Sequence, residues 1–141
     1  MATLQEQILA RLLVIAAGVP GVVVAARSRR TGVDRDETPA VIVRPGDEQD
    51  EPCGALADEH RFEPELVVMT RGEPWDTVAD PIVDALHTAI LRDTGLKAMA
   101  INVRRIAREP EDAEADSTAG QYTLRYRITY LTRADNLGAQ P

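Results

Sequence analysis

The sequence has few of the residues on which disulfides, metal sites and catalysis commonly depend. Its 141 residues include a single cysteine, Cys53, which cannot form an internal disulfide or, alone, a cysteine-based metal site. A reducing, cytoplasmic origin is therefore expected. No apolar run approaches the roughly 20 residues that a membrane-spanning helix needs. The apolar start carries Glu6 and has no basic residues before it, which argues against a signal peptide.

Catalytic motifs are missing as well. The only serines, Ser28 and Ser117, lie in turn-like segments rather than in a nucleophile elbow. The chain has no glycine-rich phosphate loop, no CxxC and no HExxH. His60 stands where an acidic segment meets a predicted strand, and His87 lies on a predicted helix, where a boundary position is the commoner role. We therefore expect no enzymatic activity, no catalytic or metal-binding residues and no cofactor.

The net charge of −7 is concentrated in two segments. Residues 46–60 carry six acids and no Lys or Arg, and residues 107–120 carry five acids against Arg108. The rest of the chain is mildly basic, at +3. A general nucleic-acid-binding protein would instead gather Lys and Arg on one exposed face. The charge pattern argues against that class.

Hydrophobic periodicity predicts an α+β fold in the order α-β-β-β-α-β-β, with a mainly antiparallel sheet of about five strands and two helices packed on one face. The clearest strand pattern is QYTLRYRITYLTR (121–133), where polar and apolar residues alternate strictly over the ten residues 121–130. We expect one domain over residues 1–135 and a loose tail over 136–141. The expected helices are 4–17 and 76–92, and the expected strands are 22–29, 39–43, 60–71, 98–106 and 121–133.

Three local signals refine these elements. Thr3 and Glu6 have the spacing of a capping box at the start of the first helix. Asp80-Pro81 has the form of an N-cap and first-position pair, which would begin the second helix after a leading turn. Pro64 has no N–H for a sheet ladder, so its strand should lie at an edge or a bulge there.

The acidic stretch after the strand PAVIV (39–43) is the strongest chemical candidate. Its carboxylates between residues 47 and 59 could surround a divalent cation, since hard cations accept oxygen clusters. Their spacing does not match an EF-hand, however. The preferred interpretation is a solvated loop whose charges keep a strand edge from self-pairing. The second acidic segment, EPEDAEAD, has Ala and Pro between its acids and is interpreted as a disordered loop, with metal binding less favoured still.

The order of these pieces resembles the tail terminators, or minor tail proteins, of the phage lambda U type. The resemblance lies in QEQILARLLVIAAGVPGV, then PAVIVRPGDEQDE, then ELVVMTRGEPWD before DPIVDALHTAIL, and finally YTLRYRITYLTRADN. It covers nearly the whole chain and carries no catalytic residues. It implies a virion tail protein, assembled in the cytoplasm of a bacterial host, that caps the tail tube as a hexameric ring. Such a ring ends tube polymerisation and forms the surface for head–tail joining.

The partners that this resemblance implies are further copies of the chain, the tail tube protein and the head–tail connector protein. DNA would pass through the ring without specific binding, and no membrane is involved. Alternatives are a head–tail connector or neck protein and, less favoured, a small divalent-metal-binding module that uses the 47–59 carboxylates.

Twelve residues are predicted to form the assembly surface. Trp75 has packing against the sheet as its default role, and Arg125 and Arg127 could instead pair with acids on a neighbouring strand. The residues are Asp47, Glu48, Asp50, Glu51, Asp58, Glu59, Glu109, Glu111, Asp112, Arg125, Arg127 and Trp75.

Overall fold

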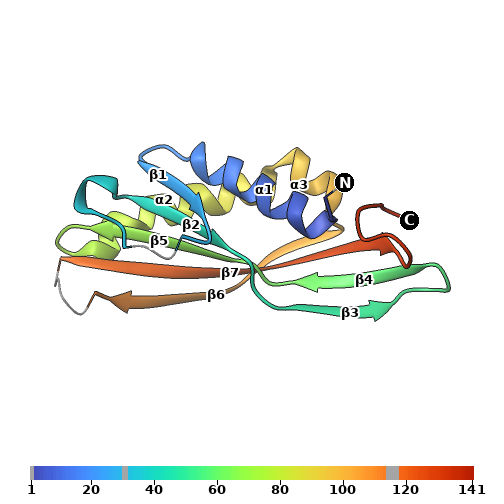
Figure 1. Cartoon of the computed structure of the whole chain (residues 1–141). Coiled ribbons are helices and arrows are strands. Elements are labelled where there is room, and N and C mark those ends of the chain that lie inside the picture. The colour runs from blue at the N-terminus through green and yellow to red at the C-terminus, as the bar shows by residue number, and fades with distance from the viewer. Residues whose placement is uncertain (1, 30–31, 114–117) are drawn as a thin grey trace.

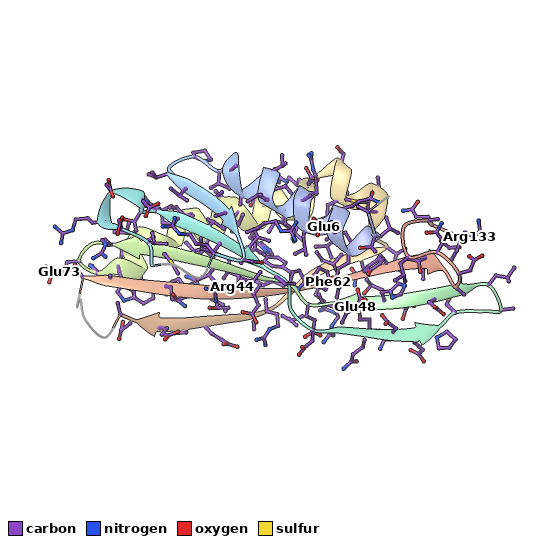
Figure 2. The ribbon with its side chains drawn as sticks, viewed as in Figure 1. Glu6, Arg44, Glu48, Phe62, Glu73 and Arg133 are labelled. Carbon is purple, nitrogen blue, oxygen red and sulfur yellow. The ribbon has the colours of Figure 1, made fainter. Side chains whose placement is uncertain are left out.

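The computed structural model describes residues 2–29, 32–113 and 118–141. It shows an elongated α+β molecule in which three helices lie over one part of a long, mostly antiparallel sheet of seven strands (Figure 1). Glu73 and Arg133 lie at opposite ends of it (Figure 2). The elements are α1 (Leu4–Ala17), β1 (Val24–Arg27), the 3₁₀ helix η1 (Arg35–Glu37), β2 (Ala40–Arg44), β3 (Glu48–Pro52), β4 (Ala57–Phe62), β5 (Glu65–Arg71), α2 (Trp75–Arg92), α3 (Thr94–Met99), β6 (Asn102–Asp112) and β7 (Ala119–Arg133).

Strand β7 is the axis of the sheet. Strands β5 and β4 follow one another along one of its edges, and the register runs unbroken from Arg71 opposite Ala119 to Ala57 opposite Arg133. The single strand expected over 60–71, with Pro64 at an edge or a bulge, is instead divided into β4 and β5, and Pro64 lies in the short gap between them. Strand β6 pairs with β7 from Gly120 to Thr129, alongside residues that also pair with β5 and β4, and therefore occupies the opposite edge.

The core lies between the sheet and the helices. Leu124, Tyr126, Ile128 and Tyr130 of β7 are buried on the helix-facing side, which confirms the predicted alternation. They meet the apolar stripes of the two long helices, including Leu12 and Leu86. No helix among the described residues is long and apolar enough to cross a membrane. The other sheet face carries charged residues on neighbouring strands, among them Arg61 of β4, Glu65 of β5 and Arg125 of β7.

The first acidic segment is not the solvated loop expected from its charges. It forms a β-hairpin, in which β3 pairs with β4 from Glu48 opposite Phe62 to Pro52 opposite Asp58. The hairpin forms because β4 continues the ladder of β5 on β7 and offers its outer edge to β3. The second acidic segment was also expected to be a loop, but its residues through Asp112 belong to β6. Glu114 and Asp116 lie outside the described residues.

Helix starts and the fourth predicted strand need correction. Helix α2 begins at Trp75, and Pro81 lies inside it rather than at its first position. Residues 94–99 form the short helix α3, so the strand expected over 98–106 begins at Asn102 instead. Thr3 does cap α1, because the Glu6 N–H donates to its Oγ1 at 3.2 Å. The Glu6 carboxylate pairs with Arg27 at 2.6 Å, however, and does not complete a capping box.

Two further differences concern the ends of the chain. Strand β1 is shorter than expected and pairs with β2 in parallel, the one parallel pair among the described strands. The C-terminal residues, expected to be loose, are held by hydrogen bonds. The Leu4 N–H donates to the Leu137 carbonyl at 2.9 Å, and the Gln140 side chain donates to the Ala98 carbonyl at 2.8 Å.

Asp93 joins three elements, and its removal should destabilise the fold. Its carboxylate accepts two hydrogen bonds from Arg11 of α1, at 2.7 and 2.6 Å, and caps α3 by accepting from the Leu96 N–H at 2.8 Å. Loss of a cap and of a charge-assisted pair predicts that Asp93→Ala lowers the free energy of unfolding by about 1–3 kcal/mol. Urea unfolding followed by circular dichroism measures this change.

The effect of Asp93 should depend on pH. The hydrogen bonds from Arg11 hold the pKa of Asp93 below its ordinary value, so its contribution is present above that ordinary value and is lost as pH falls through the lowered one. The difference between wild type and Asp93→Ala should therefore shrink in strong acid. Asp84→Asn, at an exposed position on α2, is the matched control. A constant difference down to acid pH would contradict the assignment.

Candidate functional site

The twelve predicted surface residues do not form one patch. Six belong to the β3–β4 hairpin and its root, three to β6, two to β7 and one to the start of α2. The hairpin extends beyond the helical layer at one end of the sheet (Figure 1). Trp75 and Asp112 are brought together, and the hairpin acids lie on a different part of the sheet.

Arg125 and Arg127 pair within the chain. On the sheet face opposite the helices, Arg127 lies 3.0 Å from Glu63, and Arg125 lies 3.5 Å from Glu65 and 3.8 Å from Glu109. These are cross-strand ion pairs between neighbours in the ladder, which is the simpler of the two roles considered for the arginines. Exposed pairs of this kind contribute little to stability, about 0–1 kcal/mol each.

The Trp75 side chain is packed inside the protein and does not project into solvent. Its side chain is buried against Gly120, and its ring lies 5.0 Å from that of Tyr122. Its Nε1–H donates to the carboxylate of Asp112 at 2.7 Å. Asp112 therefore has a structural partner, and Trp75 serves the default packing role at the start of α2.

The hairpin acids divide between the two faces because strand residues alternate. Glu51 and Glu59 lie opposite each other on the face away from the helices, with Arg61 bridging them at 3.4 and 3.1 Å. Glu48 and Asp50 lie on the other face. Asp50 stands directly opposite His60, which comes from β4.

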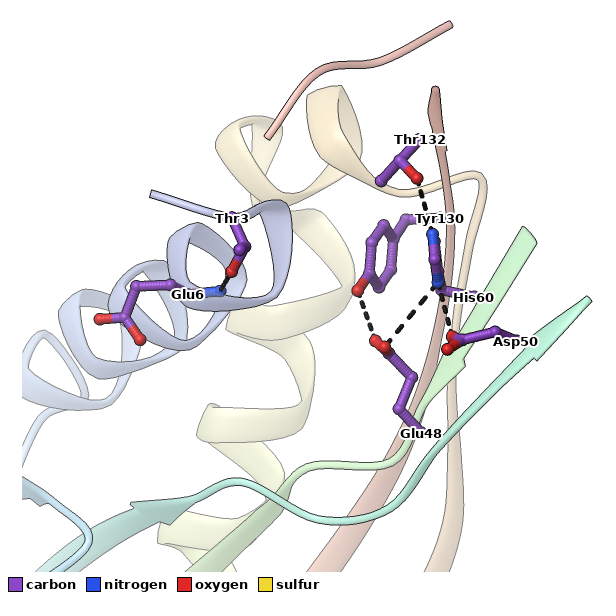
Figure 3. A network of polar contacts seen from close by, with 7 residues as sticks. All are labelled: Thr3, Glu6, Glu48, Asp50, His60, Tyr130 and Thr132. Carbon is purple, nitrogen blue, oxygen red and sulfur yellow. Dashed lines mark hydrogen bonds and ion pairs between the residues drawn. The ribbon is translucent and has the colours of Figure 1, made fainter. Parts of the chain in front are cut away.

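His60 is the centre of a polar cluster at this hairpin (Figure 3). Its ring is buried, with 1% of the residue exposed, and stacks on Tyr130 at 4.7 Å between ring centroids. Its Nδ1 lies 2.6 Å from Asp50 Oδ1 and 3.8 Å from Glu48 Oε2. Its Nε2 lies 2.7 Å from Thr132 Oγ1. Both ring nitrogens thus have polar partners, and the ring orientation is fixed.

Glu48 is fixed in a similar way. The Tyr130 hydroxyl donates to its Oε1, and the Glu48 side chain is mostly buried, at 20% exposure. Burial and the neighbouring Glu48 carboxylate raise the pKa of Tyr130 well above its ordinary value, so the phenol keeps its proton. Tyr130 is therefore a hydrogen-bond donor here and not a nucleophile. The cluster offers anionic oxygens and an imidazole, a set suited to holding a cation.

The second histidine has a different environment. His87 Nδ1 lies 2.8 Å from the Tyr126 hydroxyl, between α2 and β7. Burial and the nearby charge of Arg105 lower the pKa of His87, and burial raises the pKa of Tyr126 to about 12. His87 is therefore a neutral boundary residue, which is the role expected from its place on the helix.

Sequence reasoning missed the cluster around His60. It grouped the acids of residues 47–59 by proximity in the chain, whereas the fold selects only those on one face of the hairpin. The sequence did contain one signal: the segments that become β3 and β4 are separated by only a short connection. In a hairpin with a short turn, residues at equal distances from the turn lie opposite each other, as Asp50 and His60 do. Tyr130 and Thr132 could not be added from local sequence, because their place depends on the register between β4 and β7.

The chain was compared with protein families, curated proteins and solved structures, and a similar fold is found among the solved structures. No protein-family model matches the chain, and no curated protein does. A similar fold occurs in a chain from the solved structure of the virion of a native gene transfer agent particle, with a TM-score of 0.54 and 15% identity. The match covers 92% of this chain and 95% of that chain, so the α+β arrangement is shared nearly from end to end.

Proposed function

We propose that this chain is a structural subunit of a phage-like virion and that it acts as a tail terminator. In this role it caps the tail tube as a homohexameric ring, ends tube polymerisation and offers the surface for head–tail joining. Its partners are then its own copies, the tail tube protein and the head–tail connector protein, with DNA passing through the lumen. It would assemble in the cytoplasm of a bacterial host.

The observation that carries the proposal is the end-to-end fold likeness to a chain of a gene transfer agent virion. The resemblance of the sequence segments to tail terminators supports the particular position in the tail. These points favour a structural role over a catalytic one.

The shape of the hairpin suits contact between subunits. It extends beyond the helices, and its tip carries Leu56, whose exposure of 81% is the highest among the large hydrophobic residues described. Outer edges of β3 and β6 pair with no other described strand. An exposed apolar side chain on a projecting, charged hairpin is a suitable anchor for a neighbouring subunit.

Assembly of the purified chain tests this function. Light scattering and negative-stain imaging should show rings, either in solution or on the ends of tubes formed by the tail tube protein of the same virion. Leu56→Ala should weaken ring formation at least about tenfold, as loss of an interface anchor does, without changing the unfolding midpoint. Val14→Ala, at an exposed apolar position of α1, is the matched control.

Other results would contradict the proposal. A strict monomer that neither forms rings nor caps tubes would remove the tail-terminator role. A ring that binds the connector but leaves tube ends unaffected would instead support a neck protein.

A further inference from the structure

Three metal-ligand atoms converge at the hairpin, from Glu48, Asp50 and His60. One carboxylate oxygen of each acid and a ring nitrogen of His60 all lie within 4.8 Å of one another. They come from adjacent strands, β3 and β4, and face the same side (Figure 3). Asp50 is open to solvent, with 58% of its side chain exposed, so an ion could reach the buried histidine past it.

Two of the three side chains have hydrogen bonds that direct them toward this point. His60 Nε2 is anchored on Thr132 Oγ1 at 2.7 Å, which leaves Nδ1 facing the carboxylates. Glu48 accepts from the Tyr130 hydroxyl and keeps its other oxygen on the His60 side. Metal-binding histidines usually have such a partner on their second nitrogen, and it sets the tautomer and ring orientation.

We propose that Glu48, Asp50 and His60 bind one divalent cation of the zinc class, which includes Co²⁺. The inference goes beyond the tail-terminator function and does not depend on it. Two carboxylates and a neutral imidazole carry a charge of −2, which a divalent ion neutralises. A nitrogen donor favours zinc-like ions over Ca²⁺ and Mg²⁺, which prefer more numerous, all-oxygen ligands.

Two of the three separations between ligand atoms are close to those that a bound ion needs. Bonds of about 2.0–2.2 Å to Zn²⁺ place neighbouring ligand atoms about 3.0–3.5 Å apart. The present distances from His60 Nδ1, 2.6 Å to Asp50 and 3.8 Å to Glu48, bracket that range. Asp50 is exposed and can shift outward. Water would complete the coordination.

The proton balance follows from the hydrogen bonds. Metal binding needs the lone pair on His60 Nδ1, so the single ring proton must lie on Nε2 and donate to Thr132 Oγ1. A neutral ring with its proton on Nδ1 changes tautomer and releases no proton, and a protonated ring releases one to solvent. The bound ion would link β3 to β4 at the middle of the hairpin.

Calorimetry with Zn²⁺ and absorption spectroscopy with Co²⁺ test the site on the full chain without a polyhistidine tag. We expect one ion per chain and an affinity at least about tenfold weaker in Asp50→Asn. Glu51→Gln is the matched control, since it removes the same charge from the same strand on the opposite face. Its affinity should equal that of wild type.

Imidazole ¹⁵N spectra give a readout that charge effects alone would not produce. The chain has two histidines, so the signals of His60 and His87 can be assigned by replacing His87. Zn²⁺ should convert His60 to the Nε2-protonated, metal-bound form and leave His87 unchanged. The same concentrations of Mg²⁺ or Ca²⁺ should not.

Several results would overturn the proposal. One is no heat of binding at millimolar Zn²⁺, which would leave His60 and Asp50 as a hydrogen-bonded pair only. Others are equal affinities for wild type and Asp50→Asn, or an ¹⁵N response at His87 alone. Because Asp50 is exposed, its variant should fold, so the test does not depend on replacing the buried His60.

Discussion

Replacing Gly46 with Ala is expected to lower the free energy of unfolding by about 3 kcal/mol. A Cβ at this position would lie 1.9 Å from the Glu63 carbonyl oxygen and 3.0 Å from the carbonyl carbon. Both atoms belong to the backbone, so no side chain can rotate away. The Glu63 N–H also donates to the Asp47 carbonyl at 2.8 Å, and the clash would break this contact at the root of the β3–β4 hairpin.

Chemical unfolding of Gly46→Ala should therefore show a lower midpoint with a similar denaturant slope. Gly32→Ala is the control, because a Cβ there meets nothing within 4 Å and its backbone is not in the left-handed region. Its stability should stay within about 0.5 kcal/mol of wild type. Equal stability of the two variants would show that the strand pairing at Gly46 can relax.

The same glycine explains why the acidic hairpin was not predicted. The segment EQDEP has no apolar alternation, so its composition indicates a loop. It becomes a strand because Pro45 and Gly46 shift the register by one residue and the chain then continues along β4. The alternation of polar and apolar residues identified β7 because one face of this strand is apolar and the other is polar. It could not identify β3, whose residues beyond Glu48 are exposed on both faces.

The start of α2 shows a second limit of local sequence. Asp80-Pro81 has the composition of a helix start, yet the helix begins at Trp75, six residues before Pro81. Proline removes a single backbone hydrogen bond, and burial of Trp75 and Ala79 against the sheet favours continuing the helix. Tertiary packing therefore determines where α2 begins, and this position cannot be predicted from a local capping signal.

The prediction of the candidate site was limited in the same two ways, by a strand without alternation and by packing between distant segments. The acids and His60 were visible in the sequence, and so was the possibility of a metal. Which acids face His60 depends on the hairpin register, and the supporting Tyr130 and Thr132 depend on the register of a strand about seventy residues away. The pairing of strands that are far apart in the sequence therefore determines which residues form the candidate site, and local sequence patterns could not show it.

Gly120→Ala should be similarly costly, for a reason at the other end of the sheet. A Cβ at Gly120 would lie 2.1–2.4 Å from three atoms of the Trp75 indole. The ring cannot move freely, because its Nε1–H is bonded to Asp112 and its face packs near Tyr122. Displacing it would sacrifice part of the burial of a large aromatic side chain, so we expect a loss of about 2–4 kcal/mol.

The fluorescence of Trp75, the single tryptophan, reports this displacement directly. In Gly120→Ala the emission should shift to the red as the indole becomes hydrated, and the unfolding midpoint should fall. Gly18→Ala is the control, since its Cβ would meet atoms only at 3.6 Å and beyond. In a Trp75→Leu background the cost of Gly120→Ala should shrink, because the atoms that clash are gone. Additive losses in the double variant would show that Gly120 is needed for a reason other than its contact with Trp75. In that case the packing of Trp75 on Gly120 would not explain why α2 begins at Trp75.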